Sequence, residues 1–416
     1  MIEYTAPHEG ARVAVVGGSV IGLACAWRAA RAGFEVRVHE PEHHRAPGAD
    51  GAVPTTGAGW VAGGMLAPFS EAWPGEEDVF ALSVASLRRW PGFLGGLGDT
   101  YPARGPRRIR TASVTHLVAV DEADARDLEL AMGWAAAQPG TRPDDLGRIT
   151  RRELREAEPG LARVARAAYR MPGEGSVDNR VLLDALAAAC RDAGVTWVHE
   201  RVETLDSVDA DRVVLAAGCG SAALSATAEL PRGLPVRPVK GEVLRLAERP
   251  GCEPAPGSVV RAFVRGRPVY LVPRDGGLVV GATQYEHGED RQVTVAGVRD
   301  LLADAELVFP GIGEYELRET IAGLRPMAPD NLPMIGPLPG DPRVLCATGH
   351  GRNGIALTPV TADAVAAWLT GDEPPPESAA SDPARFVRGG SASIARATAA
   401  THPHTTPAPT TEEDPR

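Results

Sequence analysis

Glycines near the start of the chain are spaced for binding a nucleotide. Residues 12–40 predict a β-branched strand, a glycine turn, an alanine-rich helix, a second strand and a terminal acid. A helix N-terminus offers free amides and the positive end of its dipole to a pyrophosphate. We expect Gly17 to permit the tight turn and Gly22 to let the helix pack on the strand. Glu40, about 20 residues on, could accept a hydrogen bond from a ribose hydroxyl and disfavours NADP.

One position departs from the G-x-G-x-x-G pattern of such turns. Ser19 stands where the middle glycine is expected. Its Cβ narrows the room for a pyrophosphate, although its hydroxyl could donate a hydrogen bond to one. The alternative interpretation of the whole stretch is an ordinary βαβ unit with a glycine turn and no ligand.

Three later segments place small residues where a backbone could approach a ligand. They span residues 212–220, 323–336 and 349–355. The last is a glycine turn before the final predicted helix, whose N-terminal amides could face an electron-rich ring edge or an oxyanion. A plain nicotinamide dehydrogenase would not need this return of the C-terminal part to the nucleotide domain.

Composition excludes several classes of protein. The 416 residues suffice for two domains, and the net charge of −11 argues against nucleic acid or an anionic membrane as partner. The five scattered cysteines contain no C-x-x-C pair, which predicts neither a disulfide framework nor a metal site and suits a reducing, cytoplasmic location. The N-terminus has no signal-peptide pattern, and no apolar run approaches the ~20 residues of a membrane helix.

The pattern of elements changes along the chain. The first half alternates strands with helices, among them helices predicted at 79–90 and 179–193. After Pro231, short strand-like runs separated by turn signals predict an antiparallel sheet, followed by helices at 295–309 and 359–369. The last residues are rich in Pro, Ser, Thr, Ala and Glu and predict disorder, because they cannot bury enough apolar surface to offset the entropy of ordering.

The compact part of the chain, from Arg12 to about Gly371, resembles the D-amino-acid-oxidase-like flavoproteins, and among them the glycine oxidases of thiamine biosynthesis. The similarity rests on the glycine turn, on the three later segments and on further motifs at residues 62–68, 174–178, 238–242 and 279–283.

The resemblance implies an α/β fold with two domains. A Rossmann-like FAD-binding domain would combine residues 11–88, 150–234 and 318–371, and an antiparallel α+β substrate-binding domain would combine residues 89–149 and 235–317, with a disordered tail at 372–416. The cofactor would be FAD. The sarcosine oxidases of this family attach their flavin through a cysteine in the segment that matches residues 323–330, and no cysteine stands there, so we expect non-covalent FAD.

The resemblance also assigns site residues. Cofactor contacts are expected from Gly17, Gly18, Ser19, Ile21, Gly22, Glu40, Ala62, Gly64, Met65, Val202, Ala217, Gly218, His350, Gly351, Arg352, Asn353, Gly354 and Ile355. Arg325 is expected to grip a substrate carboxylate, with Tyr270 as its hydroxyl partner and Arg352 nearby. His350 could equally be a plain turn residue. No residue is assigned as a general base, because hydride transfer from a neutral amine does not require one.

The reaction implied is FAD-dependent oxidation of glycine, with O2 reduced to hydrogen peroxide and a functional link to thiazole synthase. Gln284 and Pro268 differ from the residues that some relatives carry, so the sequence does not fix the size of the substrate pocket. The alternatives are a sarcosine or D-amino-acid oxidase, a dehydrogenase with another electron acceptor, and a non-catalytic FAD-binding subunit. The sequence leaves the oligomeric state open, a homo-oligomer included.

Overall fold

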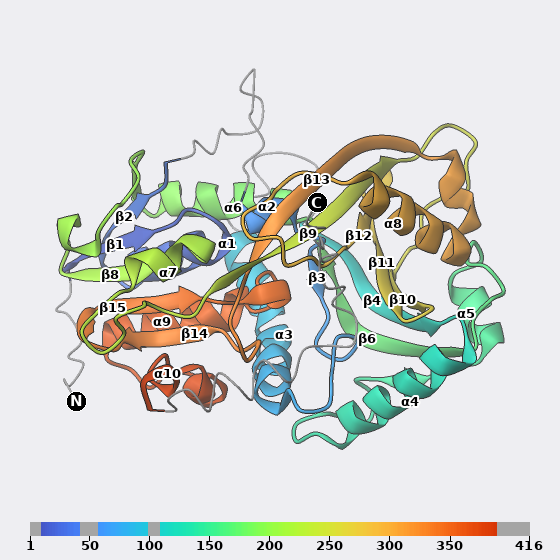
Figure 1. Cartoon of the computed structure of the whole chain (residues 1–416), viewed down its shortest axis with the longest axis horizontal. Coiled ribbons are helices and arrows are strands. Elements are labelled where there is room, and N and C mark those ends of the chain that lie inside the picture. The colour runs from blue at the N-terminus through green and yellow to red at the C-terminus, as the bar shows by residue number, and fades with distance from the viewer. Residues whose placement is uncertain (1–9, 42–56, 99–108, 389–416) are drawn as a thin grey trace, which may run out of the picture.

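A computed structural model describes residues 10–41, 57–98 and 109–388 of the chain. It contains a six-stranded and a nine-stranded sheet, which lie in the two halves of the molecule in Figure 1. The mixed α/β class that we predicted is confirmed. Within the described part, no helix is long and apolar enough to cross a bilayer.

The smaller sheet has the strand order β14-β15-β8-β1-β2-β7. All neighbours are parallel except the antiparallel pair of β14 and β15. The bounds are β1 Arg12–Val16, β2 Glu35–His39, β7 Thr196–Val198, β8 Arg212–Leu215, β14 Met334–Leu338 and β15 Asp341–Thr348. Central β1 is buried on both faces, as parallel strands covered on two sides require, so its sequence is a continuous apolar run.

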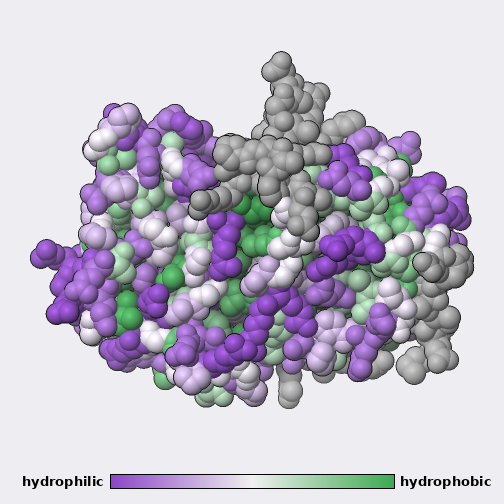
Figure 2. All heavy atoms as spheres, turned by 180° about the vertical axis from the view of Figure 1, so that it is seen from behind, coloured by the Kyte–Doolittle hydropathy of each residue, from purple (hydrophilic) through white to green (hydrophobic). Residues whose placement is uncertain are grey.

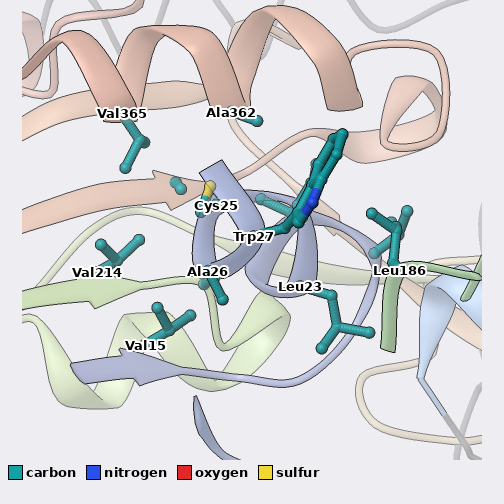
Figure 3. Close-up of a cluster of buried hydrophobic side chains, with 14 of the residues drawn as sticks. Val15, Leu23, Cys25, Ala26, Trp27, Leu186, Val214, Ala362 and Val365 are labelled. Carbon is teal, nitrogen blue, oxygen red and sulfur yellow. The ribbon is translucent and has the colours of Figure 1, made fainter. Parts of the chain in front are cut away.

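Helix α1 (Val20–Arg31) lies at the centre of the core on one face of this sheet. Figure 3 shows its side chains between Val15 of β1 and Val214 of β8 on one side and residues of two helices on the other. Those helices are α6 (Asn179–Asp192) and α9 (Thr358–Thr370). This packing explains the alanine-rich sequence of α1, because small side chains let three helices and a sheet meet.

The larger sheet has the order β13-β9-β12-β11-β10-β4-β6-β3, with β5 beside β6. Its neighbours are antiparallel except for the parallel pair of β10 and β4. The bounds are β3 Met65–Leu66, β4 Arg110–Ala119, β5 Gly147–Arg148, β6 Ala167–Val177, β9 Arg237–Ala247, β10 Val259–Val264, β11 Arg267–Arg274, β12 Gly277–Gly281 and β13 Glu316–Met327.

Among the remaining helices, α4 and α8 pack on inner strands of the larger sheet and α3 packs against α9. Their bounds are α2 Ala58–Val61, α3 Glu77–Gly98, α4 Glu122–Ala137, α5 Arg151–Ala157, α7 Ser221–Leu224, α8 Val295–Val308 and α10 Arg385–Arg388. Seen from behind in Figure 2, the outer surface is largely hydrophilic, while hydrophobic residues gather near the middle of this face.

The domain boundaries remain a proposal. β6 and β13 both belong to the larger sheet, although the boundaries predicted from the sequence assign β6, and β13 from residue 318 onward, to the nucleotide-binding domain. The two strands thus run from one proposed domain into the sheet of the other.

The prediction of disorder from residue 372 onward is wrong as far as Arg388. A 3₁₀ turn, Pro376–Ser381, buries two serines, and α10 follows it. Arg385 forms an ion pair of 2.8 Å with Asp330 and donates to the carbonyl oxygen of Leu332 at 2.7 Å. These polar contacts anchor a segment that has few apolar residues. Residues 389–416, the rest of the predicted tail, lie outside the described residues.

Candidate active site

A cavity of about 610 Å³ extends from the carboxyl ends of β1 and β2 to the face of the larger sheet. Of the predicted site residues, only Gly18 and Gly22 do not line it. The structure thus brings together segments from the first 65 and the last 100 residues of its described part. Whether these residues hold a cofactor and a substrate remains a proposal.

The glycine turn shapes the nucleotide end of this cavity. Gly17 has φ +109°, and a Cβ built on it would lie 2.4 Å from the carbonyl oxygen of Ala216. Gly22 is more constrained, because its Cβ would lie 1.8 Å from the carbonyl oxygen of Gly17. The amide of Gly18 donates to a carboxylate oxygen of Glu40 at 2.8 Å, which holds the acid against the turn. These contacts explain why the turn uses glycine and why an acid ends β2.

Ser19 is the N-cap residue of α1, and its side chain makes no capping hydrogen bond. Its Oγ lies against the 57–65 segment, 2.7 Å from where a Cβ on Gly59 would stand. Ser19 also lines the cavity, and a hydrogen bond from its hydroxyl to a ligand stays a prediction.

Main-chain atoms and small side chains form another part of the cavity wall. Gly218 has φ +58°, and a Cβ built on it would meet nothing within 4 Å. Ala217 beside it and Val202 also line the space. An extended ligand with a flat ring could lie close to these main-chain atoms, which fits a dinucleotide.

The segment 57–65 is held from behind by polar side chains that sequence reasoning missed. Asn179 Nδ2 donates to the carbonyl oxygens of Gly59 and Trp60 at 2.7 and 2.8 Å. Arg274 Nη2 donates to the carbonyl oxygen of Gly63 at 2.7 Å. Three carbonyls of the cavity wall thus have fixed partners on the far side. The only signal for Asn179 was its place at the start of α6, which we interpreted as a helix boundary.

Arg325 lies on β13 at the opposite end of the cavity from the glycine turn. Its Nη1 donates to the carbonyl oxygen of Thr283 at 3.1 Å, and its side chain lies against Gly241, where a Cβ would be 2.4 Å from Nη2. Burial lowers the pKa of the guanidinium, which stays charged near neutral pH nevertheless. Among the residues that the structure describes, Arg325 takes part in no ion pair. It is therefore suited to bind an anion.

Tyr270 projects from β11 into the same part of the cavity. Its ring lies over Gly63 and Gly281, and a Cβ on either glycine would lie less than 3.0 Å from it. Burial raises the pKa of its hydroxyl, so the group stays protonated and can donate a hydrogen bond. Tyr270 and Arg325 lie close enough to influence each other electrostatically, and their joint role at a substrate stays a prediction.

Arg352 differs from Arg325 because two carboxylates already compensate its charge. Its Nη2 lies 2.9 Å from Glu76 and its Nε 3.5 Å from Glu71. Glu71 also lies 3.8 Å from Arg261, a cavity-lining arginine that the sequence did not single out. Arg352 and Arg261 thus share two glutamates. Of the three arginines, Arg325 is the one that has no partner carboxylate among the described residues.

His350 lies in the cavity wall and is neutral. Its Nε2 lies 2.9 Å from the hydroxyl of Thr361, and burial lowers its pKa to about 3. The following turn, Gly351–Asn353, is a 3₁₀ helix, and α9 begins only at Thr358. The segment therefore brings backbone groups and a neutral imidazole to the cavity, and no positive charge from the histidine.

Glu174 is buried behind the segment that carries Glu71. One of its oxygens accepts the amides of Phe69 and Ser70, and the other accepts the hydroxyl of Ser70 at 2.7 Å. Burial is the largest cause that raises its pKa, from 4.5 to about 7. The folded state therefore keeps a proton that the unfolded chain loses, so this contribution to stability is full below pH 4.5 and is lost as the pH rises through 7.

We expect the Glu174→Gln protein to gain stability over wild type as the pH rises from 6 to 8. The amide oxygen can accept both backbone amides and the NH2 group can donate to Ser70, without a charge to bury. The full difference is on the order of 3 kcal/mol at alkaline pH. Melting temperatures of both proteins across this range measure it. If the difference in melting temperature between the two proteins does not change with pH, the proposed role of this proton is wrong.

The chain is similar to several known proteins. The chain matches the family described as FAD dependent oxidoreductase (DAO) over residues 12–368. It is 30% identical to a glycine oxidase of Pseudomonas aeruginosa, across 87% of this chain and 96% of the relative. It is 32% identical to a putative thiamine biosynthesis oxidoreductase ThiO of Rhizobium etli, across 89% of this chain and 100% of the relative. The crystal structure of glycine oxidase from Geobacillus kaustophilus superimposes with a TM-score of 0.77 at 28% identity, across 90% of this chain and 99% of that one.

Proposed function

The chain belongs to the family of FAD-dependent oxidoreductases, and from that membership we propose that it oxidises glycine or a similarly small amino acid, with O2 as the electron acceptor. The observation that carries this proposal is Arg325, a buried guanidinium in the cavity that takes part in no ion pair among the described residues. An amino-acid carboxylate is the ligand that such a group binds best, through two parallel hydrogen bonds.

FAD, when bound, supplies the two-electron acceptor for the substrate's α-hydrogen and passes the electrons to O2, which gives hydrogen peroxide. We propose that the glycine turn and the 57–65 segment hold the nucleotide, since both line the cavity. The absence of a cysteine from residues 323–330 supports non-covalent binding.

The protein's own contribution is orientation. Arg325 and Tyr270 would fix the carboxylate, so that the amine and the α-carbon point toward the nucleotide end of the cavity. The imine product then hydrolyses to glyoxylate and ammonia. The resemblance to the R. etli relative supports a role in thiamine biosynthesis, and a link to thiazole synthase remains a prediction.

The decisive experiment is an anaerobic absorbance spectrum of the purified protein before and after addition of glycine. We expect the flavin band near ~450 nm to bleach, the signature of a reduced flavin. Admission of air should restore the band and produce peroxide. If glycine leaves the band unchanged but sarcosine or a D-amino acid bleaches it, that compound replaces glycine as the proposed substrate. Bleaching without peroxide on re-oxidation would indicate a dehydrogenase.

A further inference from the structure

Residues 372–388, here named the C-terminal clasp, lie beyond the part of the chain that matches the family, which ends at residue 368. The 3₁₀ turn of the clasp contacts α3, α9 and β14, and α10 follows it below β14 in Figure 1. Membership of the family therefore assigns no role to the clasp, and its role has to be inferred from its contacts.

Arg385 of the clasp uses all the hydrogen-bond donors of its guanidinium, which has five N–H groups. Nε and Nη2 donate to the two carboxylate oxygens of Asp330 at 2.8 and 3.2 Å, and Nη2 also donates to the carbonyl oxygen of Leu332 at 2.7 Å. Nη1 donates to the carbonyl oxygens of Ser381 and Asp382 at 2.9 and 3.2 Å. The position of this guanidinium is therefore fixed far more firmly than that of an ordinary surface ion pair.

Asn331 lies between the two residues of the 328–332 turn that Arg385 holds. Its backbone is left-handed, with φ +60°, a conformation that asparagine tolerates better than most residues. Because Arg385 binds both Asp330 and Leu332, it restricts the backbone on either side of Asn331 and with it the direction of the asparagine side chain. The Nδ2 group of Asn331 donates to Oε1 of Glu76 at 2.6 Å.

Glu76 connects this turn to the cavity. Its other oxygen, Oε2, lies 2.9 Å from Nη2 of Arg352, which lines the cavity. The side chain of Glu76 is only 13% exposed, so water competes little for either oxygen. Because the two oxygens have different partners, the carboxylate cannot rotate without loss of a hydrogen bond. The amide of Asn331 thus helps to decide where the oxygen that faces Arg352 stands.

We propose that Arg385 is a positioning residue of the candidate active site and acts through Asn331 and Glu76 on Arg352. Arg352 and Arg325 lie close enough to influence each other electrostatically, so a displaced Arg352 changes the field in which a carboxylate binds. The consequence for substrate binding rests on the proposed function, whereas the contacts between the clasp and Arg352 do not.

The first test measures binding of acetate to the FAD-loaded protein through the shift of its flavin spectrum. Arg385→Met removes all five hydrogen bonds of the guanidinium and should raise the dissociation constant of acetate about fivefold. Asn331→Gly permits the left-handed backbone and removes only the amide, so we expect a similar rise. With glycine, the loss should appear in KM, while kcat stays within about twofold of wild type. An unchanged dissociation constant in both variants would overturn the inference.

The double variant distinguishes one chain of contacts from two separate effects. If Arg385 acts through Asn331, Arg385→Met should weaken acetate binding no further in a protein that already carries Asn331→Gly. Two independent effects would instead multiply to about 25-fold, and that result would contradict the inference.

Arg343→Met is the matched control. Arg343 is 28% exposed and likewise holds a turn, since it donates to the carbonyl oxygens of Leu205 and Val208 at 2.7 and 3.3 Å. It lies near the start of β15, whose opposite end lines the cavity. Arg343→Met and Arg385→Met should both lower the melting temperature, but only Arg385→Met should weaken acetate binding. An equal rise of the dissociation constant in both would indicate a general loosening of the fold and sink the proposed role.

Hydrogen exchange separates failure of this inference from failure of the proposed function, because it needs no substrate. In Asn331→Gly, amides of residues 67–77 and 349–356 should exchange at least about threefold faster than in wild type, while those of α4 exchange as before. If this change appears although acetate does not bind and no amine reduces the flavin, only the proposed function fails. If exchange does not change, the inference fails even where glycine is oxidised. Asn331→Gly also provides the test if Arg385→Met does not fold.

Discussion

The Arg325→Met protein is expected to oxidise glycine with a kcat/KM about 10²- to 10³-fold below that of wild type. Methionine fills most of the space of the side chain and removes the guanidinium that would pair with the carboxylate. Loss of one partner of a buried charged hydrogen-bonded pair costs about 2–5 kcal/mol. Steady-state kinetics with glycine measure the loss, which should appear mainly in KM.

The same variant should be more stable than wild type. Arg325 is buried without an ion pair among the described residues, so its removal relieves a desolvation cost that its hydrogen bonds to the carbonyl oxygens of Thr283 and Lys240 offset only in part. Arg325→Lys keeps a positive charge but loses the planar guanidinium group. Its kcat/KM should therefore lie between those of wild type and Arg325→Met. If Arg325→Met has normal flavin content and unchanged kinetics with glycine, Arg325 does not bind the substrate.

The second large effect is expected at Gly22, where alanine should prevent FAD from copurifying and lower the free energy of unfolding by at least about 3 kcal/mol. The added Cβ would lie 1.8 Å from the carbonyl oxygen of Gly17, a backbone atom that cannot swing aside as the end of a flexible side chain can. The turn must therefore open or α1 must shift from β1. Absorbance of the purified protein and denaturant unfolding measure both effects.

Gly133→Ala provides the matched control in another helix interior. A Cβ at Gly133 of α4 meets nothing within 4 Å. Alanine there should stabilise the protein by up to about 1 kcal/mol through helix propensity alone, with FAD retained. If Gly22→Ala behaved like this control, the close packing of α1 on the glycine turn would not matter for the site.

Much of the fold could be predicted from local patterns, and the errors have physical causes. The helix predicted at 79–90 was ended before Pro91, a residue that normally breaks helices. In the structure, α3 continues to Gly98 because Phe93 and Leu97 are buried, and Phe93 makes an edge contact with Trp27 of α1. The polar composition of residues 372–388 likewise concealed the contacts of Arg385. Tertiary packing decided both cases, and a single sequence does not display it.

The candidate site could likewise be predicted only in part. The glycine turn, Glu40 and the 349–355 segment could be picked out from their spacing in the sequence, and the structure places them around one cavity. Asn179, Arg274 and the pairing of Arg352 with two glutamates could not, because their partners are more than 100 residues away in the chain. Long-range polar contacts leave no periodic pattern in the sequence.

The order of strands in the smaller sheet has a consequence for synthesis on the ribosome. β1 leaves the ribosome before its neighbour β8 and the adjoining β15, which follow about 200 and 330 residues later. The wall formed by residues 347–356 is made later still. A nascent chain therefore lacks part of the proposed nucleotide site until residues 347–356 have been made, and FAD can select the native state only after they have left the exit tunnel. Until then the apolar strand β1 is exposed to chaperones and to aggregation.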